Sequence, residues 1–320
     1  MATFHIGVDE NGLGSRLGPL IVTAVLAETD ESGERFLSRK LPKRLREDLD
    51  DSKRLMTHTD VGLGEAWARA LTRDSARSPG ELFELLSLEG TSRLQEPCPK
   101  AAHAQCWNVG QETFGASEEQ YLRVRGHLET LAQRGVQIRE VRTSVVCTQQ
   151  LNQNRDAGIN RFVSDLHAME RLVLKLRESA GAPVLAVCGK VGGIGEYAKF
   201  FGPLAGWLHA TIVEGQAESA YQFPKLGRLR FVRDADAHAP LVMLASLVGK
   251  YVRELFMSRI AGHYPSADEA PRPSGYHDPV TAAFVERTAL LRKRRRLPDR
   301  CFERERDPLV AALKAGAAPP

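Results

Sequence analysis

The sequence predicts an α/β fold, because runs typical of strands alternate along the chain with runs typical of helices. In Thr3–Val8 every second residue is apolar, as in a strand with one buried face. Asn160–Arg177 carries apolar residues at three- and four-residue spacing, as in a helix that packs on a core. Further strands are expected over Leu20–Leu26, Val136–Cys147, Val184–Val187, Leu208–Val213 and Leu229–Arg233.

The composition is that of an ordinary globular protein. Of 320 residues, 42% are hydrophobic and 26% are charged, and no apolar run reaches membrane-spanning length. We expect no signal peptide, because the N-terminus leads straight into a strand. Five scattered cysteines argue against a disulfide framework and favour a reducing compartment, so we expect a cytoplasmic protein. A net charge of +4 and a pI of about 8.8 permit a nucleic-acid partner without requiring one.

The segment Ile6–Pro19 is the first candidate for a functional site. Asp9 and Glu10 directly follow the first strand, and glycines break the turn beyond them. Two adjacent carboxylates at a rigid strand end suit a hard divalent cation such as Mg²⁺ or Mn²⁺. The glycines would let main-chain N–H groups approach a phosphate or a sugar. The alternative is a surface hairpin turn.

Two further acidic motifs each precede a predicted helix. In Asp51-Ser52-Lys53 the lysine and nearby backbone N–H groups could contact a phosphate, or Asp51 or Ser52 could simply cap the helix. Asp234-Ala235-Asp236 opens a predicted helix that runs through about Arg259, with Pro240 near its first turn. Asp236 either caps this helix or supplies a third metal carboxylate.

The segment 64–134 contains helical patterns over Leu82–Leu88 and Tyr121–Gln133. Between them, Cys98, His103 and Cys106 have spacings that a Zn²⁺ site could use. A structural zinc site needs four ligands, however, and no fourth ligand is evident nearby in the sequence. The alternative is a pair of buried free cysteines.

Cys188-Gly189-Lys190 follows the predicted strand Val184–Val187 and begins a glycine-rich run. It is not a phosphate-binding Walker loop, because the required spacing of glycine, lysine and serine or threonine is absent. Cys188 could be a nucleophile of lowered pKa, although no histidine base is assigned to it. We expect Glu214–Gly227 to be a loop.

The C-terminal part contains a predicted helix from about Pro279 that ends in the cationic run Arg292–Arg296. This run is either an electrostatic footprint for phosphate or a solvated helix end. The tail after Pro308 is rich in alanine and proline, and we expect it to be frayed.

In their order along the chain, these motifs resemble type 2 ribonuclease H, the ribonuclease HII/HIII family. Asp9-Glu10-Asn11-Gly12-Leu13-Gly14 with Gly18-Pro19 is similar to the family signature Asp-Glu-Ala-Gly-Arg-Gly…Gly-Pro. Asp51–Leu55 is similar to its Asp-Ser-Lys-Lys-Leu, and Gly275-Tyr276 stands where the family has Lys-Gly-Tyr. Asp236…Pro240…Leu244-Ala245-Ser246…Gly249-Lys250…Arg253-Glu254 is similar to the family's Asp…Ala-Ala-Ser…Ala-Lys…Arg-Asp block. Asn160…Ala168-Met169…Leu176 resembles the helix before the family's third catalytic strand.

The resemblance implies a ribonuclease H-like mixed central sheet flanked by helices. It also implies four carboxylates that hold two divalent ions, Mg²⁺ or Mn²⁺, and hydrolyse RNA in RNA/DNA hybrids or at ribonucleotides embedded in DNA. One domain over residues 1–307, with insertions at about 64–134 and 190–228 and a disordered tail at 308–320, is expected, as is a monomer. The implied catalytic residues are Asp9, Glu10 and Asp236, and the implied nucleic-acid-binding residues are Gly12, Leu13, Gly14, Arg16, Ser52, Lys53 and Tyr276.

Two positions depart from the family pattern. The third family carboxylate falls at Cys188, and a thiol is a poor ligand for Mg²⁺. Glu196 is our preferred substitute metal ligand, with Glu218 and Asp234 as alternatives. Leu13 replaces the arginine of the glycine-rich turn, and Arg16 is close enough in sequence to take over a phosphate contact. The alternatives to an active nuclease are a catalytically impaired nucleic-acid-binding relative and an enzyme that depends on Cys188.

Overall fold

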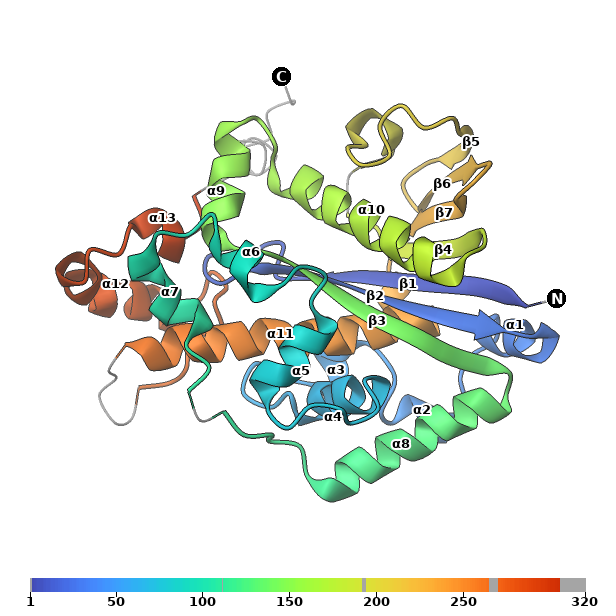
Figure 1. Ribbon diagram of the computed structural model, residues 1–320, viewed down its shortest axis with the longest axis horizontal. Helices are drawn as coiled ribbons and strands as arrows, with labels where there is room; N and C mark the ends of the chain where they lie inside the picture. Colours follow the sequence, from blue (N-terminus) through green and yellow to red (C-terminus); the bar gives the residue numbers. More distant parts are fainter. Residues whose placement is uncertain (1, 111, 192–193, 265–269, 306–320) are drawn as a thin grey trace.

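The computed structural model describes residues 2–110, 112–191, 194–264 and 270–305. Its centre is a seven-stranded mixed sheet with the order β3-β2-β1-β4-β7-β6-β5 (Figure 1). The predicted α/β class, with a mixed sheet flanked by helices, is confirmed. The strands are β1 (Thr3–Asn11), β2 (Leu20–Thr29), β3 (Val136–Val146), β4 (Val184–Gly189), β5 (Ala210–Glu214), β6 (Glu218–Phe223) and β7 (Gly227–Val232).

The pairing directions place β1 and β4 side by side at the centre of the sheet. β1 and β2 are antiparallel, as are β2 and β3, whereas β4 is parallel to both β1 and β7. In the β1–β4 register, Val8 lies opposite Cys188. Parallel neighbours end at the same edge of a sheet, so the ends of β1 and β4 meet there.

Helices cover both faces of the sheet (Figure 1). One face carries α10, whose apolar stripe packs on β1, β2 and β4, and the other carries α11 together with α4, α5 and α8. The α-helices are α1 (Glu31–Leu37), α2 (Lys43–Arg46), α3 (Ser52–Leu55), α4 (Gly62–Leu71), α5 (Pro79–Leu86), α6 (Thr91–Gln95), α7 (Lys100–Trp107), α8 (Glu118–Gln133), α9 (Thr148–Asp156), α10 (Arg161–Ala180), α11 (Pro240–His263), α12 (Pro279–Arg294) and α13 (Asp299–Phe302).

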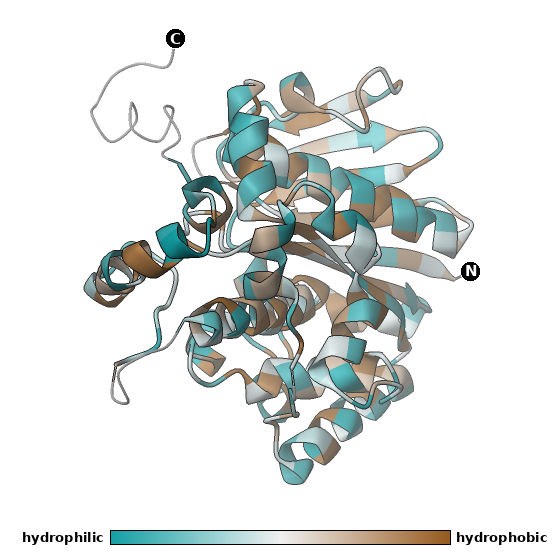
Figure 2. Cartoon of the chain, turned by 60° about the vertical axis from the view of Figure 1, so that its left-hand side comes forward, coloured by the Kyte–Doolittle hydropathy of each residue, from teal (hydrophilic) through white to brown (hydrophobic). Residues whose placement is uncertain are grey.

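Hydrophobic residues recur along the strands and along the helices that flank them (Figure 2). A smaller apolar cluster joins the far end of α11 to α12 and α13. Within the described residues, no helix is both long enough and apolar enough to cross a membrane.

Helix α11 touches the central strand because both elements carry small residues. A Cβ atom added to Gly7 would lie 2.5 Å from the backbone nitrogen of Val242, so the first turn of α11 rests directly on β1. One added to Gly249 would lie 2.6 Å from Nδ2 of Asn11. The absence of side chains at Gly7 and Gly249 therefore allows α11 to pack closely on the sheet.

Two expectations from the sequence are wrong, one about the start of α11 and one about the segment before β7. The long helix begins at Pro240 and not at Asp234, because Asp234 has left-handed backbone angles and residues Ala235–Ala237 form a separate 3-10 turn, η2. Pro240 then occupies the first helical turn, where its missing N–H costs nothing. The expected loop Glu214–Gly227 contains β6, which pairs with β5 and β7; its polar residues and the nearby Pro224 and Gly227 obscure the strand pattern in the sequence.

The segments interpreted as insertions have different architectures. Residues 64–134 form most of α4 and α5–α8, and the segment 190–228 includes a second 3-10 turn, η1 (Ala198–Phe200), and supplies β5 and β6 to the sheet. The single-domain organisation over residues 1–307 stays a prediction. The tail expected to be frayed lies outside the described residues.

We predict that Gly7→Ala destabilises the protein by about 3 kcal/mol, because the new methyl group meets α11 backbone that cannot move aside. Denaturant unfolding measures this change. The matched control is Gly126→Ala in the exposed middle of α8, where a methyl group has open space and should stabilise by about 0.5–1 kcal/mol. Equal stability of Gly7→Ala and the wild type would contradict the close β1–α11 contact.

Candidate active site

A cleft of about 620 Å³ opens where β1 and β4 end. Its walls come from the turn after β1, from α3, from the 3-10 turn η2, from α11 and from the loop before α12. The residues of the candidate site that line it are Asp9, Glu10, Gly12, Leu13, Gly14, Ser52, Lys53, Gly189, Asp234, Asp236 and Tyr276.

Asp9 and Glu10 belong to β1 itself, which continues to Asn11. They lie beside Gly189 of β4. A Cβ atom added to Gly189 would stand 3.0 Å from Oδ1 of Asp9 and 3.1 Å from Oε2 of Glu10. The missing side chain of Gly189 therefore leaves a small space toward which both carboxylates point.

Asp236 reaches the same cleft from the other end of the chain. Its Oδ2 accepts a hydrogen bond from Nζ of Lys53 at 3.3 Å, and the two groups form an ion pair. The backbone N–H of Lys53 donates to Asp51, which caps α3, so the capping interpretation of this motif is correct and Lys53 also faces the cleft. Acids that are more than 220 positions apart in sequence thus lie in one cleft.

The acids of this cleft are electrostatically strained. Burial raises the pKa of Asp9 well above its usual value, and the charges of Glu10 and Asp236 raise it further. Burial, followed by the charge of Asp165, raises the pKa of Glu10 to about 8. Lys53 partly offsets both shifts. Groups with such shifts at the floor of a cleft are typical of functional sites.

Asp165 is an acid that the sequence reasoning missed. It lies on α10 and is 1% exposed, and neither of its carboxylate oxygens has a hydrogen-bond partner among the described residues. Burial raises its pKa well above the usual value, and the charge of Asp9 adds to the shift. The available signal was an acid on the apolar stripe of the amphipathic helix, between Phe162 and Met169.

Cys188 lies in the core beneath the cleft and not on its wall. Its side chain is fully buried among apolar residues of the α10 face. Burial raises the pKa of its thiol, and Asp165 raises it further. The direction of this shift is opposite to the lowered pKa that the nucleophile interpretation of Cys188 requires.

Of the three substitute acids suggested by the sequence, Glu196 and Glu218 do not line the cleft in the described structure and Asp234 does. Glu196 is half-exposed and forms an ion pair with Lys199, and it does not line the cleft among the described residues. Glu218 is engaged across strands with Arg230 at 2.7 Å. Asp234 lies on the cleft wall, but its side chain is 74% exposed. Asp165, in contrast, is close enough to Glu10 to raise the pKa of Glu10, and close enough to Asp9 for the charge of Asp9 to raise the pKa of Asp165.

Arg16 does not face the cleft with the other residues of its turn. Its Nε donates to Glu303 at 2.6 Å, so its charge is already paired. The cationic run at the end of α12 is also partly structural, because Arg292 is buried and lies over the ring of Phe302 at 3.9 Å.

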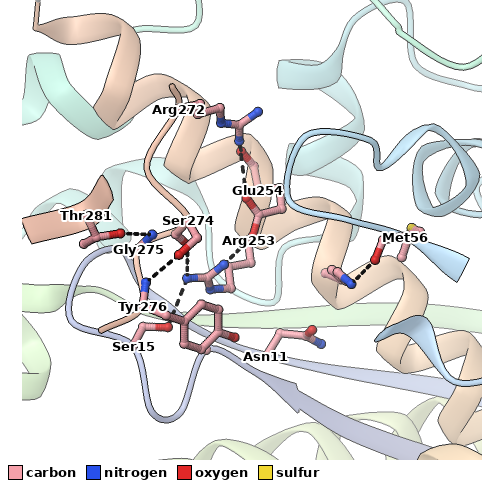
Figure 3. A network of polar contacts seen from close by, with 12 residues as sticks. Asn11, Ser15, Met56, Arg253, Glu254, Arg272, Ser274, Gly275, Tyr276 and Thr281 are labelled. Carbon is pink, nitrogen blue, oxygen red and sulfur yellow. Dashed lines mark hydrogen bonds and ion pairs between the residues drawn. The ribbon is translucent and has the colours of Figure 1, made fainter. Parts of the chain in front are cut away.

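Two buried arginines hold the glycine-rich turn in place. Arg253 donates to Oγ of Ser15 at 3.0 Å and to the carbonyl oxygen of Ser274 at 2.9 Å, and its guanidinium lies 4.4 Å from the ring centroid of Tyr276 (Figure 3). Arg304 donates to the carbonyl oxygens of Gly12 at 2.6 Å and Gly18 at 2.9 Å. The turn after β1 and the loop that carries Tyr276 therefore form one rigid wall.

The donor set fits a hard divalent cation, although among the described residues no three metal-binding side chains already form a cage. Carboxylate oxygens are the ligands that Mg²⁺ and Mn²⁺ prefer. The unpartnered oxygens of Asp165 and the space over Gly189 are the observations that fit such an ion. A cation would also relieve the mutual repulsion of these acids.

Comparisons with known proteins found structural likenesses and no sequence matches. No family model and no curated protein matches the chain. The chain is similar to RNase HII from Archaeoglobus fulgidus, solved in a complex with PCNA, with 18% identity, a TM-score of 0.42 and coverage of 95% of this chain and 94% of the other. It is also similar to Bst-RNase HIII in complex with Mn²⁺, with 14% identity, a TM-score of 0.43 and coverage of 94% of this chain and 66% of the other. The ribonuclease H2 from Pyrococcus horikoshii OT3 shares 14% identity with this chain, with a TM-score of 0.41 and coverage of 94% of this chain and 92% of the other.

These solved structures are ribonucleases HII and HIII, the family that the sequence motifs resemble. With identities of 18% or less and TM-scores below 0.5, they carry no weight for the activity, metal or substrate of this chain. The activity, metal and substrate are therefore proposed from the residues of the cleft.

We predict that Asp165→Asn raises the Tm of the metal-free protein at mildly alkaline pH by about 2–4 °C, roughly 1 kcal/mol in a large domain. The folded-state pKa of Asp165 lies above its unfolded value, so its stabilising contribution is full at acidic pH and is lost as pH rises through the folded pKa. Asparagine does not ionise, so the difference should grow with pH in thermal melts.

The control is Glu178→Gln on the exposed side of α10, which should leave the pH dependence unchanged. An Asp165→Asn variant that is equally destabilised at every pH would contradict the unpaired state of this carboxyl group.

Proposed function

We propose that this chain is an endonuclease, dependent on Mg²⁺ or Mn²⁺, that hydrolyses RNA in RNA/DNA hybrids or at ribonucleotides embedded in DNA. The observation that carries the proposal is the meeting of Asp9, Glu10 and Asp236 in one cleft beside a glycine-rich turn. The family resemblance of the motifs that contribute these residues supports the same reaction.

Asp9, Glu10 and Asp236 would hold the metal, with Asp165 as the buried fourth carboxylate. When bound, divalent ions in such a site activate a water molecule and stabilise the leaving oxygen of an in-line displacement. These carboxylates would orient the attacking water relative to the phosphodiester, since Asp9 and Glu10 project from a rigid strand and Asp165 from a packed helix.

The cleft walls supply the groups that would bind the nucleic acid. Lys53 lies beside Asp236 with 78% of its side chain exposed, so its ammonium group can contact a phosphate. Gly14 leaves its backbone open to the cleft, because a Cβ atom there would meet nothing within 4 Å in the described structure. Its main-chain groups can therefore approach a ribose 2′-OH, the group that distinguishes RNA from DNA. Tyr276, 43% exposed and held by Arg253, offers a ring face to the adjoining sugar.

The second candidate is a catalytically impaired nucleic-acid-binding relative. The observation that favours it is Cys188, a buried thiol at the strand position where the family pattern has an acid. Under this alternative the cleft binds a hybrid duplex, but the remaining acids do not support cleavage.

We predict that Asp9→Asn lowers cleavage of a duplex carrying one ribonucleotide by roughly 10²-fold or more, because even an indirect partner of a metal ligand is typically worth about 10–100-fold. Gel-resolved cleavage with Mg²⁺ or Mn²⁺ measures the loss. Glu178→Gln is the control and should retain full activity. Unchanged cleavage by Asp9→Asn would reject the metal site.

A second prediction separates the two candidates through Cys188. We expect the wild type to cleave the duplex. We also expect cleavage by the double variant Asp165→Ser with Cys188→Asp, because this variant moves one carboxylate from α10 to β4 and keeps the number of acids constant. Circular dichroism should first establish that the variant folds. An inactive wild type together with an active Cys188→Asp or double variant would establish the impaired relative instead.

A further inference from the structure

Four of the five cysteines come together at one end of the molecule, away from the acidic cleft. Cys98 precedes α7, Cys106 lies on α7, Cys147 caps α9 and Cys301 lies on α13. All four line one small cavity of about 10 Å³, and all are free thiols. Figure 1 shows α7, α9 and α13 grouped at this end of the molecule.

The spacing of one pair of these sulfur atoms matches that of neighbouring ligands in tetrahedral coordination. The Sγ atoms of Cys98 and Cys147 are 3.7 Å apart. Zinc–sulfur bonds of about 2.3 Å in a tetrahedron place neighbouring sulfurs about 3.8 Å apart. The same separation is far longer than a disulfide bond, which is about 2.05 Å.

The other two thiols are close enough to interact electrostatically with this pair. Hydrogen bonding with Cys147 lowers the pKa of the Cys98 thiol, but Cys301 and burial raise it to about 11. Burial raises the pKa of Cys106, and Cys147 and Cys98 raise it further. The four thiols are thus close enough to affect one another's pKa, although among the described residues no three metal-binding side chains are grouped as they would be around an ion.

Some of the groups around the sulfurs favour thiolates. The backbone N–H of Gln150 donates to Sγ of Cys147 at 3.4 Å, at the N-terminus of α9. A hydrogen bond with Cys98 lowers the pKa of Cys301 and the charge of Arg300 lowers it further, whereas the charge of Arg259 offsets only part of the rise that burial causes in the pKa of Cys106. His103 does not compete as a ligand, because its Nε2 contacts the carbonyl oxygens of Gln95 and Cys98.

We propose that Cys98, Cys106, Cys147 and Cys301 bind one Zn²⁺ ion as a structural site that is separate from the acidic cleft. Four thiolates are a common ligand set of closed structural zinc sites. The cavity, about the size of one water molecule, accommodates a single ion and not an iron–sulfur cluster.

This site would join three parts of the chain that are distant in sequence. The segment containing Cys98 and Cys106 would be tied to the end of β3 through Cys147 and to the C-terminal α13 through Cys301. Gln105 already links two of these parts, because its Nε2 donates to the carbonyl oxygen of Cys301 at 3.0 Å. Closing such long loops by a metal stabilises a fold by restricting the unfolded chain.

The test is the metal content and Co²⁺ spectrum of the full-length protein purified without chelator or affinity metal. We expect one Zn²⁺ per chain by elemental analysis. We also expect that Co²⁺ added to the demetallated protein gives thiolate-to-cobalt charge-transfer bands and the intense visible bands of a tetrahedral site. Cys98→Ser and Cys301→Ser should each reduce the charge-transfer intensity and weaken Zn²⁺ binding at least 10-fold. Cys188→Ser is the matched control, and its Zn²⁺ content should equal that of the wild type.

The cobalt titration of the wild type keeps the test decisive where a serine variant fails to fold. Absence of both bound zinc and the charge-transfer bands would overturn the proposal, as would bands that persist undiminished in the folded Cys98→Ser and Cys301→Ser proteins. A disulfide between Cys98 and Cys147 in the freshly purified protein, seen by mass spectrometry of non-reduced peptides, would also overturn it. These outcomes do not depend on whether the acidic cleft has nuclease activity.

Discussion

The candidate site depends on the close contact between β1 and α11. Gly7 has no side chain, so the first turn of α11 lies against the central strand, and the short turn η2 that precedes this helix brings Asp236 toward Asp9. The same strand pairs with β4, whose Gly189 leaves room for carboxylate oxygens of β1. Steric fit at two glycines, one on each of two neighbouring strands, thus determines where the acids of the cleft meet.

This arrangement has an electrostatic cost that a bound cation would offset. Asp9, Glu10 and Asp165 are each shifted toward the neutral form by burial and by one another's charge, and Lys53 offsets part of the repulsion. A structure selected for stability alone would replace such acids with apolar residues. Buried acids that repel one another are instead expected where a protein holds a metal ion.

The local sequence pattern was enough to predict much of the fold. It was not enough to predict contacts between residues that are distant in sequence. Alternation and helical spacing predicted the strands β1–β4 and the helix α10, and the motif order predicted that Asp236 belongs with Asp9 and Glu10. The placement of Asp165 requires knowing which turn of α10 lies under β1, which no local pattern contains. Glu196 was chosen for its closeness to Cys188 in sequence, but in the described structure it pairs with Lys199 and does not line the cleft. Only two members of the thiol cluster could be grouped from the sequence, because Cys98 and Cys106 are close in sequence. Cys147 and Cys301 lie near them only in the folded structure.

The most direct measurement of the shared cation is anomalous diffraction from crystals soaked in Mn²⁺. We predict a manganese peak in the cleft within coordination distance of carboxylate oxygens from Asp9, Glu10 and Asp236. A cleft without manganese at a concentration that saturates activity, or a peak that Asp236 does not touch, would contradict the proposed site.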